Sequence, residues 1–337
     1  MKYYHYNDEE SITCMLCKHY CKLKKDKCGI CGINFNSGGE LFNTTYSHPS
    51  SIYVDPIEKK PLYHFLPSSS SLSIGTVGCN FRCPFCQNYS ISQTTEVDHS
   101  ITLSPKEVVE LAVKHNTKSI SYTYNEPTIW YHYAKDIGVL AKEKGIKNVF
   151  VSSGYESDEV LEDMKSWLDG ANIDLKSFSH DYYKNVLKTN LDGVLESLVE
   201  FAKSDIWLEI TTLLIPGVND SETEIHKMAE FISTKLGKDI PWHFSAFHPD
   251  YKMMDTPRTS LEMMQKAKNI AKSYGIEYIY LGNIENDRST YCYKCGEKLI
   301  DRSGVSSKIL NLEDSVYESL GVKVCPSCGT KIVGVWS

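Results

Sequence analysis

The sequence predicts an α/β protein built on a sheet of parallel strands, with a small cysteine-rich module at each end. Short apolar runs alternate with amphipathic segments from residue 72 to residue 285, which is typical of repeated βαβ units. The 12 cysteines fall into three groups, and residues 87–291 contain none. The 337 residues suffice for one large domain with appendages or for two modest domains.

Composition and charge narrow the function classes. With 41% hydrophobic and 23% charged residues, the chain is not disordered, collagenous or coiled-coil. The 36 basic and 43 acidic residues give a net charge of −7, so no global positive field attracts nucleic acid or an anionic membrane. No apolar run approaches the roughly 20 residues of a membrane span, and the polar first residues do not resemble a signal peptide. We therefore expect a cytoplasmic protein whose reduced cysteines hold metals.

The first two segments are expected to be a small module and a connection. Residues 1–45 have little apolar periodicity and are rich in Lys, Gly and Cys, which indicates a module organised by metal instead of by a hydrophobic core. Residues 46–71 contain a serine run and four prolines, which favours an extended linker; the prolines are Pro49, Pro56, Pro61 and Pro67.

Residues 72–285 are expected to hold the parallel sheet. The predicted strands are Leu72–Val77, Ser119–Tyr124, Asn148–Ser152, Ala171–Leu175, Trp207–Ile215, Trp242–Phe247 and Glu277–Leu281. The amphipathic segments between them predict helices, among them Ser104–His115, Ile129–Lys144, Asp158–Leu168, Ser221–Leu236 and Ser260–Tyr274. At about 210 residues the repeat is shorter than the roughly 250 of an eight-unit barrel, so a partial barrel of six or seven units and an open doubly wound sheet both fit. Either fold places its site at the carboxyl ends of the strands.

Three cysteines directly follow the first predicted strand. Cys79, Cys83 and Cys86 have the spacing C-x3-C-x2-C, and three thiolates in one tight loop can hold three corners of a [4Fe–4S] cluster. The next cysteine along the chain is Cys292, so the fourth iron would have no protein ligand. A structural zinc ion normally has four ligands in paired C-x2-C turns, so the spacing favours a cluster with one open iron.

At this motif the sequence resembles the radical SAM superfamily, whose signature is C-x3-C-x-aromatic-C after the first strand of a partial (β/α) barrel. Further segments are similar to the enzyme of the AmmeMemoRadiSam system, a homologue of pyruvate formate-lyase activating enzymes: Asp55–Phe65, Ser73–Phe81, Tyr122–Thr128 (YTYNEPT), Ile173–Lys176 and Pro241–Met253. The likeness runs from about Cys14 to Trp336. It implies a partial (β/α)6-type barrel over residues 72–285.

The resemblance implies a one-electron mechanism with two cofactors. A [4Fe–4S] cluster on Cys79, Cys83 and Cys86 would be reduced, and S-adenosylmethionine on its open iron would be cleaved to a 5′-deoxyadenosyl radical that takes a hydrogen atom from the substrate. The partners implied are a reducing electron donor of the flavodoxin or ferredoxin type and an unknown small-molecule or protein substrate, under anaerobic conditions.

Four further residues are expected near the cofactor. By the resemblance, Glu126 meets the methionyl ammonium, although Tyr124 and Asn125 replace the glycines that commonly precede it. Asp174 and Lys176 end the fourth predicted strand on one face, and the corresponding lysine of activating enzymes approaches the methionyl carboxylate. A salt-bridged pair at the rim is the alternative. His243 is expected near the adenosine, with a hydrogen-bonded core histidine as the alternative.

The tail at residues 286–337 is expected to be a zinc-ribbon-like module. Cys292 and Cys295 form one C-x2-C-Gly turn, Cys325 and Cys328 form a second, and four sulfurs can surround one zinc ion. A second Fe–S cluster is the alternative. 

The N-terminal cysteines leave the ligand set open. Five thiols are available, and we expect a metal site, zinc rather than Fe–S, in which one of Cys21 and Cys28 is not a ligand. The five are Cys14, Cys17, Cys21, Cys28 and Cys31.

The leading hypothesis for function is a radical SAM oxidoreductase acting on an unknown substrate. A first alternative is an activase that installs a glycyl radical on a partner enzyme. A non-catalytic zinc-ribbon scaffold is a second. A thiol-disulfide oxidoreductase is a third, because Cys83 and Cys86 form a C-x2-C pair, but that mechanism has no use for Cys79.

Overall fold

The central sheet has eight strands in the computed structural model, which describes residues 2–303, 307–314 and 322–337. Their order is β13-β12-β11-β10-β9-β8-β7-β6. Seven of them are parallel and lie side by side in chain order: β7 (Ser70–Gly75), β8 (Ser119–Tyr122), β9 (Lys147–Ser152), β10 (Gly170–Asp174), β11 (Trp207–Leu214), β12 (Trp242–Ala246) and β13 (Ile279–Gly282). A strand order that follows the chain is that of a barrel and not of a doubly wound sheet. Within the described residues β13 and β6 are edge strands, so the predicted partial barrel is confirmed and is open on one side.

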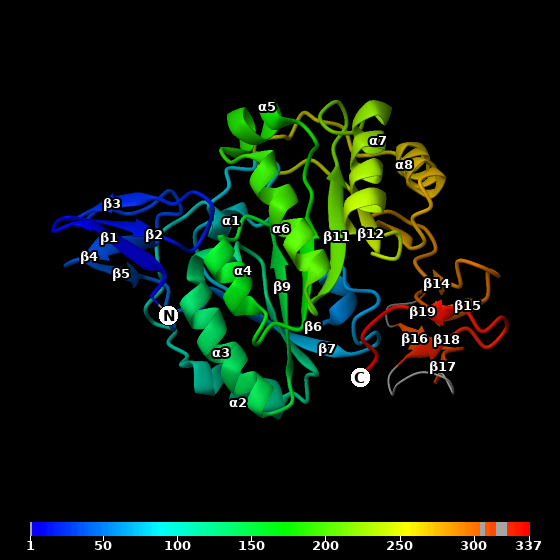
Figure 1. Cartoon of the computed structure of the whole chain (residues 1–337), viewed down its shortest axis with the longest axis horizontal. Coiled ribbons are helices and arrows are strands. Elements are labelled where there is room, and N and C mark those ends of the chain that lie inside the picture. The colour runs from blue at the N-terminus through cyan, green and yellow to red at the C-terminus, as the bar shows by residue number, and fades with distance from the viewer. Residues whose placement is uncertain (1, 304–306, 315–321) are drawn as a thin grey trace.

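Helices cover the outer face of this sheet, as Figure 1 shows. The long ones are α2 (Pro105–Lys114), α3 (Tyr131–Glu143), α4 (Asp158–Met164), α6 (Leu191–Lys203), α7 (Glu222–Phe231) and α8 (Leu261–Ser273). Short turns are η1 (Ile57–Lys59), α1 (Tyr89–Ser92), η2 (Pro127–Trp130), α5 (His180–Tyr182), η3 (Tyr183–Leu187) and η4 (Ile232–Leu236). Serines cap three of these helices: Ser104 forms a capping box with Glu107, and Ser221 and Ser260 each accept an N–H bond. No helix of the described residues is long and apolar enough to cross a membrane.

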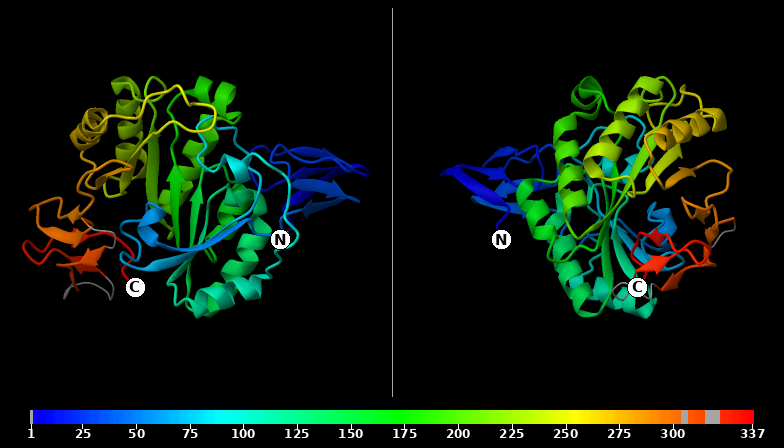
Figure 2. Two further views of the ribbon diagram at one scale, coloured as in Figure 1. Left: turned by 180° about the vertical axis from the view of Figure 1, so that it is seen from behind. Right: turned by 45° about the vertical axis from the view of Figure 1, so that its right-hand side comes forward.

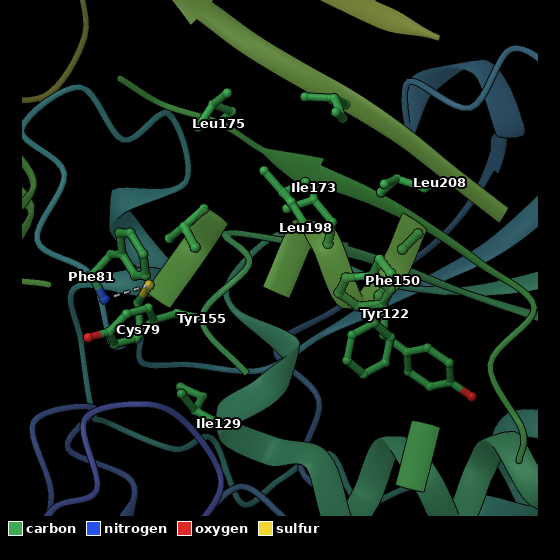
Figure 3. Packing of buried hydrophobic residues seen from close by; sticks show 14 of the residues in the cluster. Cys79, Phe81, Tyr122, Ile129, Phe150, Tyr155, Ile173, Leu175, Leu198 and Leu208 are labelled. Atoms are coloured by element: carbon green, nitrogen blue, oxygen red, sulfur yellow. Dashed lines mark hydrogen bonds between the residues drawn. The ribbon is translucent and has the colours of Figure 1, made fainter. Parts of the chain in front are cut away.

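An aromatic cluster joins the sheet to α3. The rings of Tyr122, Phe150 and Trp167 lie within 5.7 Å of one another between centroids, and all three are buried. Tyr122 and Phe150 are drawn in Figure 3 among the strand residues of the core. Trp167 packs against Gly138 so closely that a Cβ there would lie 2.2 Å from its ring. The absence of a side chain at Gly138 therefore sets the distance between α3 and this cluster.

The N-terminal module consists of two small sheets that pack on one side of the barrel (Figures 1 and 2). One contains β1 (Tyr4–Asp8), β2 (Ser11–Cys14) and β3 (Lys22–Lys24), and the other contains β4 (Asn34–Ser37) and β5 (Glu40–Asn43). The module is tied to the loop after β9, because Lys18 N donates to Tyr155 O and Ser157 Oγ donates to Met15 O. It therefore covers the same end of the barrel at which the strands finish.

Part of the segment that the prolines indicated as a linker belongs to the sheet. Residues 51–56 form β6 (Ser51–Pro56), which pairs antiparallel with β7 along its whole length. Pro56 is the last residue of this edge strand, a position at which its missing N–H costs no ladder bond. Asp55 then accepts bonds from Lys60 Nζ (2.9 Å) and Tyr124 Oη (2.9 Å), which fixes the turn after β6 against the end of β8.

The C-terminal module lies on the side of the barrel away from the N-terminal one (Figures 1 and 2). Its described strands form two small sheets: β14 (Thr290–Tyr291), β15 (Lys298–Asp301) and β16 (Lys308–Ile309), then β17 (Glu313–Asp314), β18 (Lys323–Val324) and β19 (Lys331–Ile332). The last residues return to the barrel, where Leu66 N donates to Val335 O (2.7 Å) and Val335 N donates to His64 O (2.8 Å). His64 is fully buried there, with ring contacts to Val333 O and Tyr280 Oη.

Candidate functional site

The three central cysteines lie in a loop that leaves β7 and turns back over the barrel mouth. Cys79 and Cys83 are buried and Cys86 is half-buried. The turn requires Gly78, whose φ is +87° and whose hypothetical Cβ would lie 2.9 Å from Cys31 O. Figure 3 shows the Cys79 sulfur accepting a bond from Phe81 N (3.4 Å), and the ring of Phe81 packs on that of Tyr155 at 5.8 Å between centroids. The loop is thus packed tightly enough to hold its thiols in fixed positions.

All three thiols face one cavity of about 250 Å³ at the carboxyl ends of the strands. Each parallel strand of the barrel, or the loop that follows it, contributes to the wall. One residue for each strand, in chain order, is Cys79, Glu126, Ser152, Asp174, Thr211, Ser245 and Asn283. A larger groove of about 810 Å³ lies outside the barrel between α4 and α6, and none of the predicted ligands lines it. The barrel mouth is therefore the candidate site, where the strand topology predicts it.

Burial makes these thiols poor acids in the absence of a positive charge. Burial, followed by the charge of Glu126, raises the pKa of Cys79 well above its usual range. Burial also raises the pKa of Cys83 to about 12, although the nearby Lys176 ammonium opposes this. A cationic iron centre removes that penalty, because the thiolate is then paired with positive charge. Three sulfurs on one cavity wall, with no nitrogen or oxygen ligand among them, fit an Fe–S cluster.

Glu126 is held rigidly at the mouth of the barrel. One of its carboxylate oxygens accepts bonds from Thr128 Oγ1 (2.8 Å) and Ser152 Oγ (2.8 Å), and the other accepts from Ser153 N (2.8 Å). The side chain is 2% exposed and faces the cavity. Ser152 also bonds to the buried Glu156, whose pKa is raised to about 7 by burial and by Glu126. The Glu126 carboxylate is thus held in position to bind a cation in the cavity.

Asn125 joins the end of β8 to the cysteine loop. Its side-chain nitrogen donates to Gly78 O (2.9 Å), Val77 O (3.2 Å) and Thr76 Oγ1 (3.1 Å). Its oxygen accepts from Thr76 N (3.2 Å) and from the indole of Trp130 (3.1 Å). This role could not be predicted from the sequence, because the partners are mostly backbone atoms nearly 50 residues away in the chain. Asn125 therefore holds the cysteine loop against the end of β8.

Asp174 and Lys176 lie on one face at the end of β10, as their alternation predicts, and both line the cavity. They form an ion pair at 2.6 Å, with the lysine side chain 11% exposed. Burial lowers the pKa of Lys176, but Asp174 and the neighbouring Cys83 outweigh it, and the pKa is raised overall. The lysine therefore stays charged beside the thiols.

His243 lies in β12, two residues before Ser245, which lines the cysteine cavity. It is buried, its Nε2 is 2.6 Å from Glu209 Oε2, and it lines a second cavity of about 570 Å³. The two cavities adjoin, because Thr211, Ser245 and Asn283 line both. Glu209 also accepts bonds from Tyr63 N and His64 N, and the sequence analysis did not identify it. Its position in β11, two residues before Thr211 on the inward face, is the signal that was available.

The four C-terminal cysteines form a compact group. Their sulfurs all lie within 4.8 Å of one another, with Cys292 and Cys328 at 3.6 Å and Cys295 and Cys325 at 3.6 Å. A zinc ion with Zn–S bonds of about 2.3 Å separates tetrahedral sulfurs by about 3.8 Å. The predicted four-cysteine arrangement is therefore present, with a spacing that suits one ion.

The N-terminal cysteines are less compact. Cys14, Cys17 and Cys31 are buried, Cys21 is half-buried and Cys28 is exposed. Within the described ranges no three of them bring their sulfurs within 4.8 Å of one another, in contrast to the C-terminal set. 

Comparison with known proteins identifies the barrel. Residues 73–231 match the family described as the Radical SAM superfamily. The uncharacterized protein MJ0808 of Methanocaldococcus jannaschii is 39% identical over 334 residues, which is 98% of this chain and 97% of that one. Pyruvate formate-lyase 1-activating enzyme of Escherichia coli is 22% identical over 219 residues, 60% of this chain and 89% of that enzyme.

A solved structure supports the same fold. Streptococcus suis SuiB bound to S-adenosylmethionine superposes with a TM-score of 0.52 at 13% identity, over 68% of this chain and 53% of SuiB. The family match covers the cysteine loop and strands β8 to β11, whose carboxyl ends form much of the cavity wall. The chain therefore belongs to the radical SAM superfamily.

Proposed function

We propose that this protein is a radical SAM oxidoreductase whose [4Fe–4S] cluster is held by Cys79, Cys83 and Cys86. The observation that carries the proposal is the convergence of three thiols, two carboxylates and one ammonium on a single cavity at the carboxyl ends of the parallel strands. When bound, the cluster and S-adenosylmethionine would supply reductive cleavage of the sulfonium to a 5′-deoxyadenosyl radical, which takes a hydrogen atom from the substrate.

The charged groups of the cavity suit the two ends of a bound amino acid. Glu126 would bind the methionyl ammonium, and four hydrogen bonds hold its carboxylate in place before the ligand arrives. Lys176 would meet the methionyl carboxylate, with Asp174 orienting the ammonium through their 2.6 Å ion pair. Because these contacts are formed in advance, little reorganisation is needed on binding.

The adjoining cavity is the proposed place of the substrate. Its wall contains Tyr63, Arg288 and Arg302, and it meets the cysteine cavity at Thr211 and Ser245. Arg302 belongs to the C-terminal module, so that module forms part of the wall. The predicted adenosine contact of His243 stays a prediction, since the ring faces this cavity and is bonded to Glu209.

A glycyl-radical-enzyme activase is the second candidate. Its support is the likeness to the Escherichia coli activating enzyme over 60% of this chain. The likeness does not extend to the full length, and the chain adds a cysteine module at each end. The broader proposal, an enzyme of the AmmeMemoRadiSam type with an unknown substrate, is supported by the segments that resemble that family along nearly the whole chain. A flavodoxin- or ferredoxin-type protein is the proposed reductant, in the cytoplasm.

The C-terminal cysteines are proposed to hold zinc. The two printed sulfur separations, both 3.6 Å, agree with the edge of a tetrahedron around a single ion. A hydrogen bond between Thr330 and Cys328 lowers the pKa of that thiol, which favours the thiolate that zinc requires.

Anaerobic reconstitution with iron and sulfide tests the central proposal. We expect an EPR signal that changes on addition of S-adenosylmethionine, and 5′-deoxyadenosine in the presence of dithionite. The variant Cys79→Ala should lose both, whereas Cys28→Ala, which removes an exposed thiol, should keep both. A wild-type protein that makes no 5′-deoxyadenosine would favour the non-catalytic scaffold, and a fully active Cys79→Ala variant would favour a thiol-disulfide enzyme.

The choice between the two substrate classes needs an isotope experiment. With deuterated candidate small molecules, label in 5′-deoxyadenosine identifies the hydrogen donor. Label from a deuterated glycyl-radical enzyme would instead establish the activase.

A further inference from the structure

Four of the five N-terminal thiols are at least partly buried in the N-terminal module. Cys14 N donates to Cys21 O (2.9 Å), which brings the end of β2 next to the following turn. Asn34 Nδ2 donates to the Cys31 sulfur at 3.4 Å. Cys14, Cys17 and Cys31 are buried, and Cys21 is half-buried. These four thiols are thus at least partly enclosed by the small N-terminal module.

Cys28 differs from the other four. Its side chain is exposed, and its backbone forms a bridge to Phe35 at the outer edge of the module. The structure therefore distinguishes Cys21 from Cys28, because Cys21 is half-buried and Cys28 is exposed. Cys21 faces Gly29 at the centre of the module, where its sulfur is 3.3 Å from the position of a hypothetical Cβ.

The sulfur–sulfur distances of the C-terminal cysteines differ from those of the central and N-terminal cysteines. The four C-terminal sulfurs lie within 4.8 Å of one another, as ligands of one ion must. Among the described residues neither the N-terminal thiols nor the central three form such a compact group. A cubane carries its thiolates on separate iron atoms, so its ligands are further apart than those of a single ion. The N-terminal set therefore resembles the central site and not the zinc-type site of the same chain.

The N-terminal group also touches the central cysteine loop directly. His19 Nε2 is 3.0 Å from Asn80 O, and Arg82 donates both to Cys79 O (2.6 Å) and to Ile30 O. Cys31 O packs against Gly78, the residue before Cys79. The N-terminal module and the central cysteine loop are therefore in direct contact.

Asn80 is placed between the two sets. It is fully buried, and its amide nitrogen has no hydrogen-bond partner among the described residues. Its side-chain oxygen is 4.0 Å from the Cys79 sulfur. An unpaired buried N–H costs free energy, and sulfur atoms of a bound cluster would accept it.

We propose that Cys14, Cys17, Cys21 and Cys31 hold a second [4Fe–4S] cluster, which relays electrons to the cluster at Cys79, Cys83 and Cys86. In each transfer the outer cluster gains one electron from a reduced flavodoxin- or ferredoxin-type donor and returns to its oxidised state as the inner cluster is reduced. No bond is made or broken. The relay rests on the proposed function, whereas the identity of the outer metal site does not.

Iron analysis of a variant without the central site tests the metal assignment. After anaerobic reconstitution, wild type should contain about eight iron atoms per chain, and Cys79→Ala/Cys83→Ala/Cys86→Ala should keep about four, with a cluster EPR signal after reduction. Zinc should stay at about one atom per chain in both. Little iron in the triple variant, or about two zinc atoms per chain, would overturn the second cluster.

The complementary variant tests ligands and relay. Cys14→Ser/Cys31→Ser should lose about half of the iron but keep the EPR response to S-adenosylmethionine, whereas Cys28→Ser should match wild type. Stopped-flow reduction of the inner cluster by a flavodoxin-type donor should be lost or slowed in the double variant, and reduction by dithionite should not. Equal rates with the protein donor would refute the relay. A wild-type EPR signal that does not change on addition of S-adenosylmethionine would instead refute the proposed function. The metal assignment from the iron content would still stand.

Discussion

At the scale of single residues, the site is built from a few charged groups that neighbouring hydroxyls and amides hold in place. Cys79, Cys83 and Glu126 could be recognised in the sequence, because their residue types and spacing are tied to their chemistry. Asn125 could not, because it acts through backbone atoms that only the folded chain brings near, and Glu209 was marked only by its inward position in β11.

Replacing Glu126 by Gln removes the negative charge and keeps the size of the side chain. A hydrogen bond to a charged group contributes roughly 1.5–3 kcal/mol, so we expect the Kd for S-adenosylmethionine to rise roughly 10- to 150-fold. Equilibrium binding to the reconstituted protein measures this. Glu156→Gln is the matched control, because Glu156 bonds to the same Ser152 and Thr128 but does not line the cavity, and its Kd should stay near that of wild type. Equal losses in the two variants would mean that packing, not charge, is responsible.

At the scale of elements, the alternation of apolar runs and amphipathic segments predicted all seven parallel strands within a few residues of their observed bounds. β6 was not predicted, since the prolines around it are typical of a linker and its pairing with β7 depends on the edge of the sheet being free. The choice between a barrel and a doubly wound sheet depended on strand order, which periodicity does not contain.

Gly138→Ala tests the contact between α3 and the aromatic cluster. Alanine favours a helix by about 1 kcal/mol over glycine, but its Cβ would lie 2.2 Å from the buried ring of Trp167. We expect a net loss of roughly 1–2 kcal/mol in the free energy of unfolding, because overpacking a rigid core costs more than the helix gains. Urea denaturation measures it. Gly145→Ala serves as a control with no nearby atoms but a φ of +70°, so its loss would come from backbone strain alone. A stabilised Gly138→Ala variant would show that Trp167 moves freely.

His64 links the last residues of the chain to the barrel, and its burial predicts a pH dependence. Burial lowers its pKa from 6.5 to about 4. Between these values the unfolded chain binds a proton that the folded chain does not, so stability is complete above pH 6.5 and falls as the pH drops toward 4. The full loss amounts to roughly 3 kcal/mol.

The variant His64→Gln checks this dependence. It should be less stable than wild type near neutral pH, because the bonds to Val333 O and Tyr280 Oη are weakened, but its stability should fall less on acidification. Urea denaturation from pH 5 to 7.5 gives the difference between the two proteins, in which losses common to both cancel. Parallel curves would show that His64 does not titrate in this way.

At the scale of the whole molecule, two cysteine modules flank one barrel on opposite sides (Figure 2). The N-terminal one packs on the cysteine loop, and the C-terminal one forms part of the wall of the second cavity. Cysteine spacing predicted both modules, but it could not show which side of the barrel each would occupy, since that depends on contacts such as Val335 with His64.

The independence of the two modules is testable through the C-terminal metal. Cys295→Ser should reduce zinc from about one atom per chain to near zero, since a four-thiolate site rarely holds zinc with three. Iron content and the EPR response to S-adenosylmethionine should stay as in wild type, because Cys295 is remote from the cysteine loop. Elemental analysis and EPR of the same sample measure both. A parallel loss of iron would show that the two ends of the chain fold as one unit.

The opposite placement of the modules also bears on the order of events in turnover. A protein donor that docks on the N-terminal module would cover the outside of the cysteine loop, whereas the second cavity lies beside Arg302 of the other module. Donor and substrate can then occupy the enzyme together, since neither has to leave to admit the other. Such an enzyme follows a ternary-complex scheme, in which initial rates give intersecting and not parallel double-reciprocal lines.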